Sequence, residues 1–158
     1  MKSWISLPLL ALSLAIAPAC KTRKTTEPPV VDNPSPPETP PCPPLAKADP
    51  ARASNPISGL TASVIGDCIE LKVSYSGGCK PHRFDLEWNG AHAESMPPQV
   101  NLNLVHNNGG DICRELKNEK LSFDLHTIRY GGVGQVIINL TAEGVPLQRA
   151  NYTYQPEK

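Results

Sequence analysis

The chain has 158 residues, with 15 Lys and Arg, 15 Asp and Glu, 18 Pro and 5 Cys. This length supplies one ordinary domain, and the zero formal net charge argues against a nucleic-acid partner, which would require a basic surface. Because the prolines crowd the first third of the chain, only the stretch from about Asn55 onward can bury a hydrophobic core.

A secretory signal peptide is predicted at residues 1–19. Lys2 gives the chain a positive start, and an almost unbroken apolar run extends from Trp4 to Ala17. The run holds about 14 residues, whereas a membrane-spanning helix needs about 20, so export is favoured over a permanent transmembrane anchor. Export would place every later cysteine in an oxidising compartment.

Small residues precede Cys20 in the segment Leu14-Ala15-Ile16-Ala17-Pro18-Ala19-Cys20, which resembles the lipobox of bacterial lipoproteins. The resemblance implies cleavage before Cys20, acylation of its sulfur by chains such as palmitate, and attachment to a lipid bilayer of the bacterial cell envelope. Lipoboxes usually have Leu where Ala17 stands, so ordinary A-x-A cleavage with secretion is the alternative. Lys21 replaces the Asp that marks inner-membrane retention in enterobacterial lipoproteins, which favours the outer membrane.

Residues 20–55 are predicted to be a disordered, proline-rich linker. Proline removes backbone donors and fixes φ, so this segment should be extended and polyproline-like. At 3.1 Å per residue, about 25 such residues would span roughly 75 Å and lift the folded part clear of a membrane. The folded domain is therefore expected at residues 56–158.

Apolar residues alternate with polar ones after the linker, which is typical of β-strands with one wet face. Phe84, Leu86 and Trp88, for example, share one face of a predicted strand. Glycine and asparagine turns separate about seven such segments. We therefore predict an all-β fold, a single small antiparallel β-sandwich of immunoglobulin-like architecture, with one helical turn within Ile112 to Glu119. The predicted strands are Leu60 to Ile65, Ile69 to Tyr75, His82 to Trp88, Val100 to Leu104, Leu121 to Leu125, Val136 to Leu140 and Leu147 to Tyr154.

Four cysteines follow Cys20 and are candidate disulfide partners. If the second, third and fourth strands form a meander, Cys79 and Cys113 lie at one pole and Cys68 lies at the other. We therefore predict a disulfide between Cys79 and Cys113, with Cys42 and Cys68 either paired with each other or free. Closing a loop of about 35 residues would stabilise the fold by about 4 kcal/mol in the chain-entropy model.

The same geometry brings two histidines to the pole of Cys79 and Cys113. Cys79, His82, His106 and Cys113 form an alternative zinc or copper site, since sulfur and imidazole ligands suit those metals. Metal binding needs thiolates, which a disulfide consumes, so the disulfide is favoured and no cofactor is predicted.

The segment from Ser76 to His82, together with His106-Asn107 and Asp111 to Cys113, is similar to small uncharacterised domains carried by bacterial lipoproteins. The resemblance brings no activity with it. The chain lacks a Gly-x-Ser-x-Gly nucleophile motif and a phosphate loop, so no catalytic residue and no enzymatic activity are predicted. We expect a membrane-anchored envelope protein whose polar loops, 76–81 and 107–111, bind a protein or glycan ligand or serve a structural role.

Overall fold

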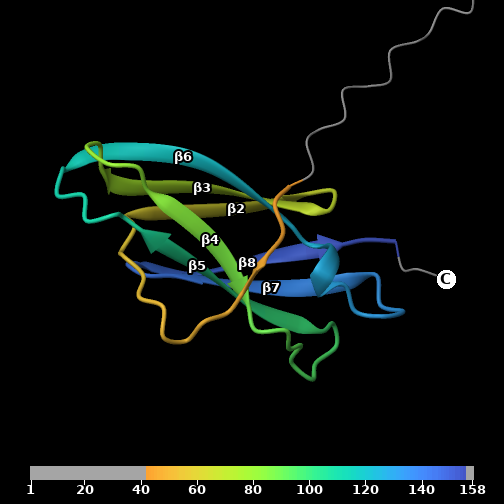
Figure 1. Cartoon of the computed structure of the whole chain (residues 1–158). Helices are drawn as coiled ribbons and strands as arrows, with labels where there is room; N and C mark the ends of the chain where they lie inside the picture. The colour runs from red at the N-terminus through yellow and green to blue at the C-terminus, as the bar shows by residue number, and fades with distance from the viewer. Residues whose placement is uncertain (1–41, 156–158) are drawn as a thin grey trace, which may run out of the picture. The chain divides into compact units, whose positions relative to one another are not determined.

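Two β-sheets make up the part of the chain that the computed structural model describes, residues 42–155 (Figure 1). The predicted signal peptide and Cys20 lie outside these residues. Among the described residues, no helix combines the length and apolarity needed to cross a membrane. The elements are β1 (Ala46–Lys47), β2 (Gly59–Ile65), β3 (Cys68–Gly77), β4 (Arg83–Trp88), β5 (Gln99–Asn107), β6 (Glu115–Asp124), the 3-10 helix η1 (His126–Ile128), β7 (Gln135–Ala142) and β8 (Val145–Thr153).

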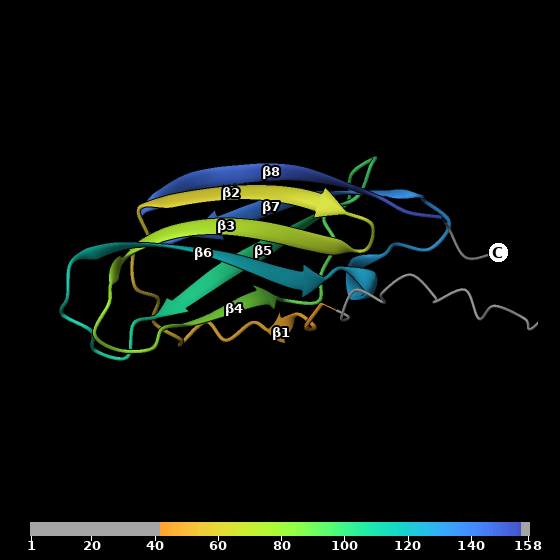
Figure 2. The ribbon, with the colours of Figure 1, turned by 90° about the horizontal axis from the view of Figure 1, so that it is seen from above.

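One sheet has five strands in the order β1-β4-β5-β7-β8, and the other has three in the order β2-β3-β6. Most neighbouring strands are antiparallel. β5 and β7 are parallel because the chain between them passes through β6 in the other sheet, and β1 is parallel to β4. β2 and β8 lie side by side where the two sheets meet (Figure 2). The predicted all-β architecture of two sheets is confirmed, although not every strand pair is antiparallel.

The core lies between the sheets and is built from the alternating apolar residues that the sequence displays. In β3, the side chains of Ile69, Leu71 and Val73 are at most 1% exposed, whereas Lys72 between them is exposed. Fully burying such a side chain contributes about 1.5–3 kcal/mol, so strand alternation accounts for much of the driving force for folding. All seven predicted strands are present.

The helical turn predicted within Ile112 to Glu119 is wrong. Glu115 begins β6 and pairs with Gly77, the last residue of β3. The segment from Glu115 onward is therefore a strand of the three-stranded sheet. Pairing with a neighbouring strand overrides the weak local preference of this charged segment. The one short helix of the described chain instead follows β6, at His126–Ile128.

Residues 42–58, here called the strap, pack on the domain although most of them were assigned to the linker. β1 pairs with the end of β4, Leu45 packs against the core, and the Asn55 N–H donates to the His106 carbonyl at 2.8 Å. Arg52 bonds Asp85 and Glu87, of which Glu87 is only 3% exposed. The folded part therefore includes Cys42 and begins earlier than the predicted boundary at residue 56.

Candidate functional site

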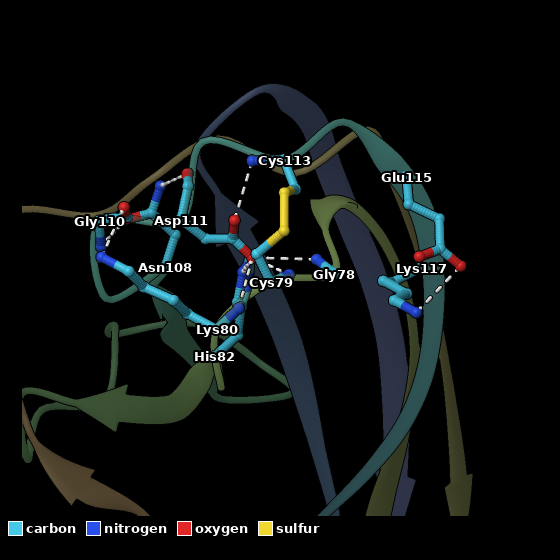
Figure 3. Close-up of a disulfide and its surroundings, with 10 residues drawn as sticks. All are labelled: Gly78, Cys79, Lys80, His82, Asn108, Gly110, Asp111, Cys113, Glu115 and Lys117. Carbon is cyan, nitrogen blue, oxygen red and sulfur yellow. Dashed lines mark hydrogen bonds and ion pairs between the residues drawn. A yellow bond between two sulfur atoms is a disulfide. The ribbon is translucent and has the colours of Figure 1, made fainter.

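Two connections meet at one end of the sandwich, and together we call them the loop pole: residues 78–82 between β3 and β4, and residues 108–114 between β5 and β6 (Figure 3). From the sequence, these two connections were expected to meet because the second, third and fourth strands were assumed to form a meander. The structure places them together for another reason, because β3 and β6 are antiparallel neighbours in one sheet while β4 and β5 are antiparallel neighbours in the other.

Disulfides join Cys79 to Cys113 and Cys42 to Cys68. The Cα atoms are 5.9 Å apart in the first pair and 6.2 Å in the second, within the ordinary range for a disulfide. The first bond ties the two connections of the loop pole together. The second ties the start of the strap to the start of β3, so of the two options left open for Cys42 and Cys68, the structure has them paired.

Asp111 organises the loop pole from within. Its Oδ2 accepts N–H bonds from Gly78 and Cys79 at 2.9 Å and from Lys80 at 3.0 Å, while Oδ1 accepts from Cys113 at 2.8 Å. The bond from the Cys113 N–H, followed by those from Cys79 and Lys80, holds the pKa of Asp111 well below its usual range. One buried carboxylate thus satisfies backbone donors of both connections.

A chain of hydrogen bonds runs through two histidines from the strap to Asp111. The Asn55 carbonyl contacts His106 Nδ1 at 3.3 Å, His106 Nε2 contacts His82 Nδ1 at 2.8 Å, and His82 Nε2 contacts Asp111 Oδ2 at 3.3 Å. Both ends of this chain are acceptors, so each end needs a ring N–H, and the central bond needs one more. Three N–H groups on two imidazoles are one proton more than two neutral rings carry.

His106 is held in this chain by packing as well as by bonding. It is 2% exposed and stacks on Phe84, with ring centroids 4.5 Å apart and planes 4° from parallel. Burial, and after it the charge of His82, lowers the pKa of His106.

Gly77 makes room for His82. A Cβ atom on Gly77 would lie 2.6 Å from His82 Nε2, closer than side chains tolerate, and 3.3 Å from Asp111 Oδ2. Sequence reasoning placed Gly77 and Asp111 in polar loops and gave neither a role of its own. It missed Asn55 altogether, because Asn55 falls in the predicted linker. The one signal that could have found Asp111 is the run Asn107-Asn108-Gly109-Gly110 before it, which is typical of a tight, side-chain-bonded turn.

The four residues of the alternative metal site lie close together but do not present four ligands. The two sulfurs are bonded to each other, and the facing nitrogens of His82 and His106 are bonded to each other. Ligand atoms of Cys79, Asp111 and Cys113 lie within 4.8 Å of one another, yet Asp111 is already occupied by N–H donors. In this oxidised state the cluster has a structural role, because it holds the two connections together.

A hollow of about 370 Å³ lies beside this cluster, between the strap and the 108–114 connection. His106 reaches it, but both ring nitrogens are engaged by Asn55 and His82, so neither is available to transfer a proton to a bound molecule. The chemistry on offer is hydrogen bonding and apolar contact. The lining residues are Asn55, Pro56, Ile57, Ser58, Ser76, His106, Asn108, Asp111, Ile112, Cys113 and Arg114.

Comparison with known proteins defines the fold and goes no further. No known family model and no curated protein matches the chain. Among solved structures, it resembles a candidate toxin-related protein from Parabacteroides distasonis (17% identity, TM-score 0.55, covering 72% of this chain and 61% of that one). It also resembles a NigD-like immunity protein from Bacteroides caccae (16% identity, TM-score 0.53, covering 72% and 64%) and a candidate lipoprotein from Bacteroides fragilis (12% identity, TM-score 0.47, covering 73% and 69%).

The chain therefore spans less than two thirds of the length of the first two structures. At identities this low, the likeness to them is one of fold alone: a small two-sheet domain that also occurs in Parabacteroides and Bacteroides proteins.

Proposed function

We propose that the chain is a lipoprotein of the bacterial cell envelope, held in the outer membrane through acylated Cys20, and that its β domain binds a macromolecular ligand at the loop pole without catalysing a reaction. In this proposal residues 1–19 are removed as a signal peptide. The residues between Cys20 and Cys42 act as a tether, and the strap and sandwich form the displayed domain.

The position of Cys42 is the observation that carries this proposal. Cys42 is bonded to Cys68, the first residue of β3, whereas the loop pole follows Gly77, the last residue of that strand. At about 3.3 Å per residue, β3 separates these two ends by about 30 Å. A tether that enters at Cys42 would therefore leave the loop pole at the end of the domain that faces away from the membrane.

Three further observations support the proposal. The four cysteines of the described chain form two disulfides, which is the state expected of an exported protein. The fold resembles that of a NigD-like immunity protein and of a candidate toxin-related protein. The hollow beside the loop pole offers hydrogen-bonding groups and apolar surface, as a recognition site does.

Attachment is tested by growing cells that express the full chain with radiolabelled palmitate, beside cells expressing Cys20→Ala. We expect label in the wild-type protein only, an intact mass that shows cleavage before residue 20, and wild-type protein in the outer-membrane fraction of a density gradient. A chain that stays in the cytoplasm, unlabelled and with residues 1–19 in place, would refute the proposal. A cleaved but unlabelled chain in the medium would replace it with simple secretion.

A further inference from the structure

The loop pole, taken with the strand ends that flank it, is basic although the domain as a whole is not. Within residues 76–83 and 106–117 there are four Lys and Arg and two acidic residues, whereas the rest of the described chain has six Lys and Arg and nine acidic residues. One of the two acidic residues at the pole, Asp111, points inward and is occupied by backbone donors. The outer surface of the pole is therefore more positive than the count indicates, and the other surfaces are net negative.

Three of these four cations, Lys80, Arg83 and Arg114, make no ion pair within residues 42 to 155. Lys117 is neutralised by Glu115 at 3.0 Å, and the Lys80 ammonium donates to the carbonyls of Gly109 and Gly110. Arg83 and Arg114 are exposed, and neither makes an ion pair with any residue from 42 to 155. Unpaired guanidinium groups raise the local concentration of negatively charged partners and speed their association.

An exposed aliphatic side chain shares the hollow with Arg114 and stands on fixed backbone. Ile112 is 91% exposed and borders the hollow, although its neighbours Asp111 and Cys113 are fixed by hydrogen bonds and by the disulfide. Little backbone entropy remains to be lost when such a residue is buried by a partner. An apolar residue on fixed backbone, next to cations, is a suitable anchor for a protein interface.

We propose that the loop pole docks an acidic protein surface, with Ile112 as its apolar anchor and Arg83 and Arg114 as the cations that select for negative charge. A protein fits this surface better than a glycan, because no Trp, Tyr or Phe that could stack on a sugar lines the hollow. This inference rests on the proposed function and specifies the chemistry of its ligand.

The test uses a displayed library of random twelve-residue peptides, selected against the full mature chain. We expect enrichment of peptides that combine Asp or Glu with aliphatic residues. Their affinity should fall about tenfold or more in the double variant Arg83→Glu/Arg114→Glu, and similarly in Ile112→Ser, and it should weaken with added salt. The matched control is Lys72→Glu/Arg149→Glu, which reverses two exposed charges on the sheets and should leave binding unchanged. Thermal unfolding of each variant establishes that it is folded.

Two outcomes would overturn the inference. Selected peptides without negative charge, or peptides that bind the pole variants and the wild type equally well, would remove the acidic partner. Binding of anionic lipid vesicles or sulfated glycans that the pole variants lose, with no acidic peptides selected, would assign the basic pole to another class of ligand. Neither result bears on palmitate labelling of Cys20, so failure here is distinguishable from failure of the proposed function.

Discussion

His82 lies in the space that a side chain on Gly77 would occupy, and this close approach makes Gly77 sensitive to substitution. His82 is fixed on one side by His106 and on the other by Asp111, so it cannot move aside at little cost. We expect Gly77→Ala to lower the free energy of unfolding by about 1–3 kcal/mol, the range for overpacking a buried site. Urea denaturation measures this directly.

Gly131→Ala is the matched control. No atom lies within 4 Å of a Cβ at Gly131, and its φ is not in the left-handed region, so this substitution should be neutral or stabilise by about 0.4–1 kcal/mol. Equal effects of the two substitutions would show that the clash with His82 is relieved without cost.

Burial of His106 makes the stability of the domain depend on pH. The pKa of His106 lies below its ordinary value of 6.5 in the folded protein, whereas the unfolded chain takes up a proton near that value. The contribution of the neutral ring to stability is therefore complete above about pH 6.5 and is lost as the pH falls below it. Urea denaturation at a series of pH values between 7.5 and 5 should show a falling free energy of unfolding for the wild type.

As the pH falls, the free energy of unfolding should decline less steeply in His106→Gln than in the wild type, because the glutamine side chain does not titrate. Identical pH dependences in the wild type and in His106→Gln would contradict this account.

At the scale of elements, a single carboxylate and a disulfide join two connections, each of which crosses from one sheet to the other. In Asp111→Asn, an amide NH₂ replaces one acceptor among backbone donors that both connections supply. We expect the thermal midpoint at pH 7 to fall by several degrees. Glu115→Gln, at a carboxylate that is 65% exposed and bonded only to Lys117, is the control and should change the midpoint little.

The effect of Asp111→Asn on stability is predicted to depend on pH. The folded-state pKa of Asp111 is depressed from its ordinary value of 3.8, so the stabilisation by its carboxylate is complete above that pH and is lost as the pH falls below it. The stabilities of the wild type and Asp111→Asn should therefore converge in acid. A constant difference down to the lowest pH at which the wild type folds would show that the charge of Asp111 is not what joins the connections.

At the scale of the whole molecule, the strap decides where the folded unit begins. A chain that starts at residue 56 lacks Cys42, Leu45 and Arg52, so it leaves Cys68 unpaired and Glu87 buried without its cation. Loss of the disulfide alone should cost about 3.5 kcal/mol in the chain-entropy model. We expect this chain to unfold at much lower urea concentration than one that starts at residue 20.

The variant Cys42→Ser/Cys68→Ser of the longer chain separates the two contributions. It removes the disulfide but keeps Leu45 and Arg52, so its stability should lie between those of the two chains. If the chain that starts at residue 56 were as stable as the longer one, the boundary predicted from the proline content would be correct after all.

The local alternation of apolar and polar residues was sufficient to predict seven strands and the all-β class. Alternation is a property of each strand alone, because successive side chains point to opposite faces whatever the neighbouring strand is. The position of Cys79 and Cys113 could likewise be predicted, since it requires only that the two connections lie at one end of the fold.

Which strands are neighbours, by contrast, was decided only by the tertiary structure. The alternation in β3 and β4 is the same whether they share a sheet or face each other across the core, so the sequence could not separate the two arrangements. The roles of Asn55, Gly77 and Asp111 depend on contacts between segments that are far apart in the chain. The proline-rich strap has no apolar period of its own. It is held in place by contacts with distant parts of the chain, among them the edge of β4, the Cys42–Cys68 bond and the hydrogen bond from Asn55 to His106.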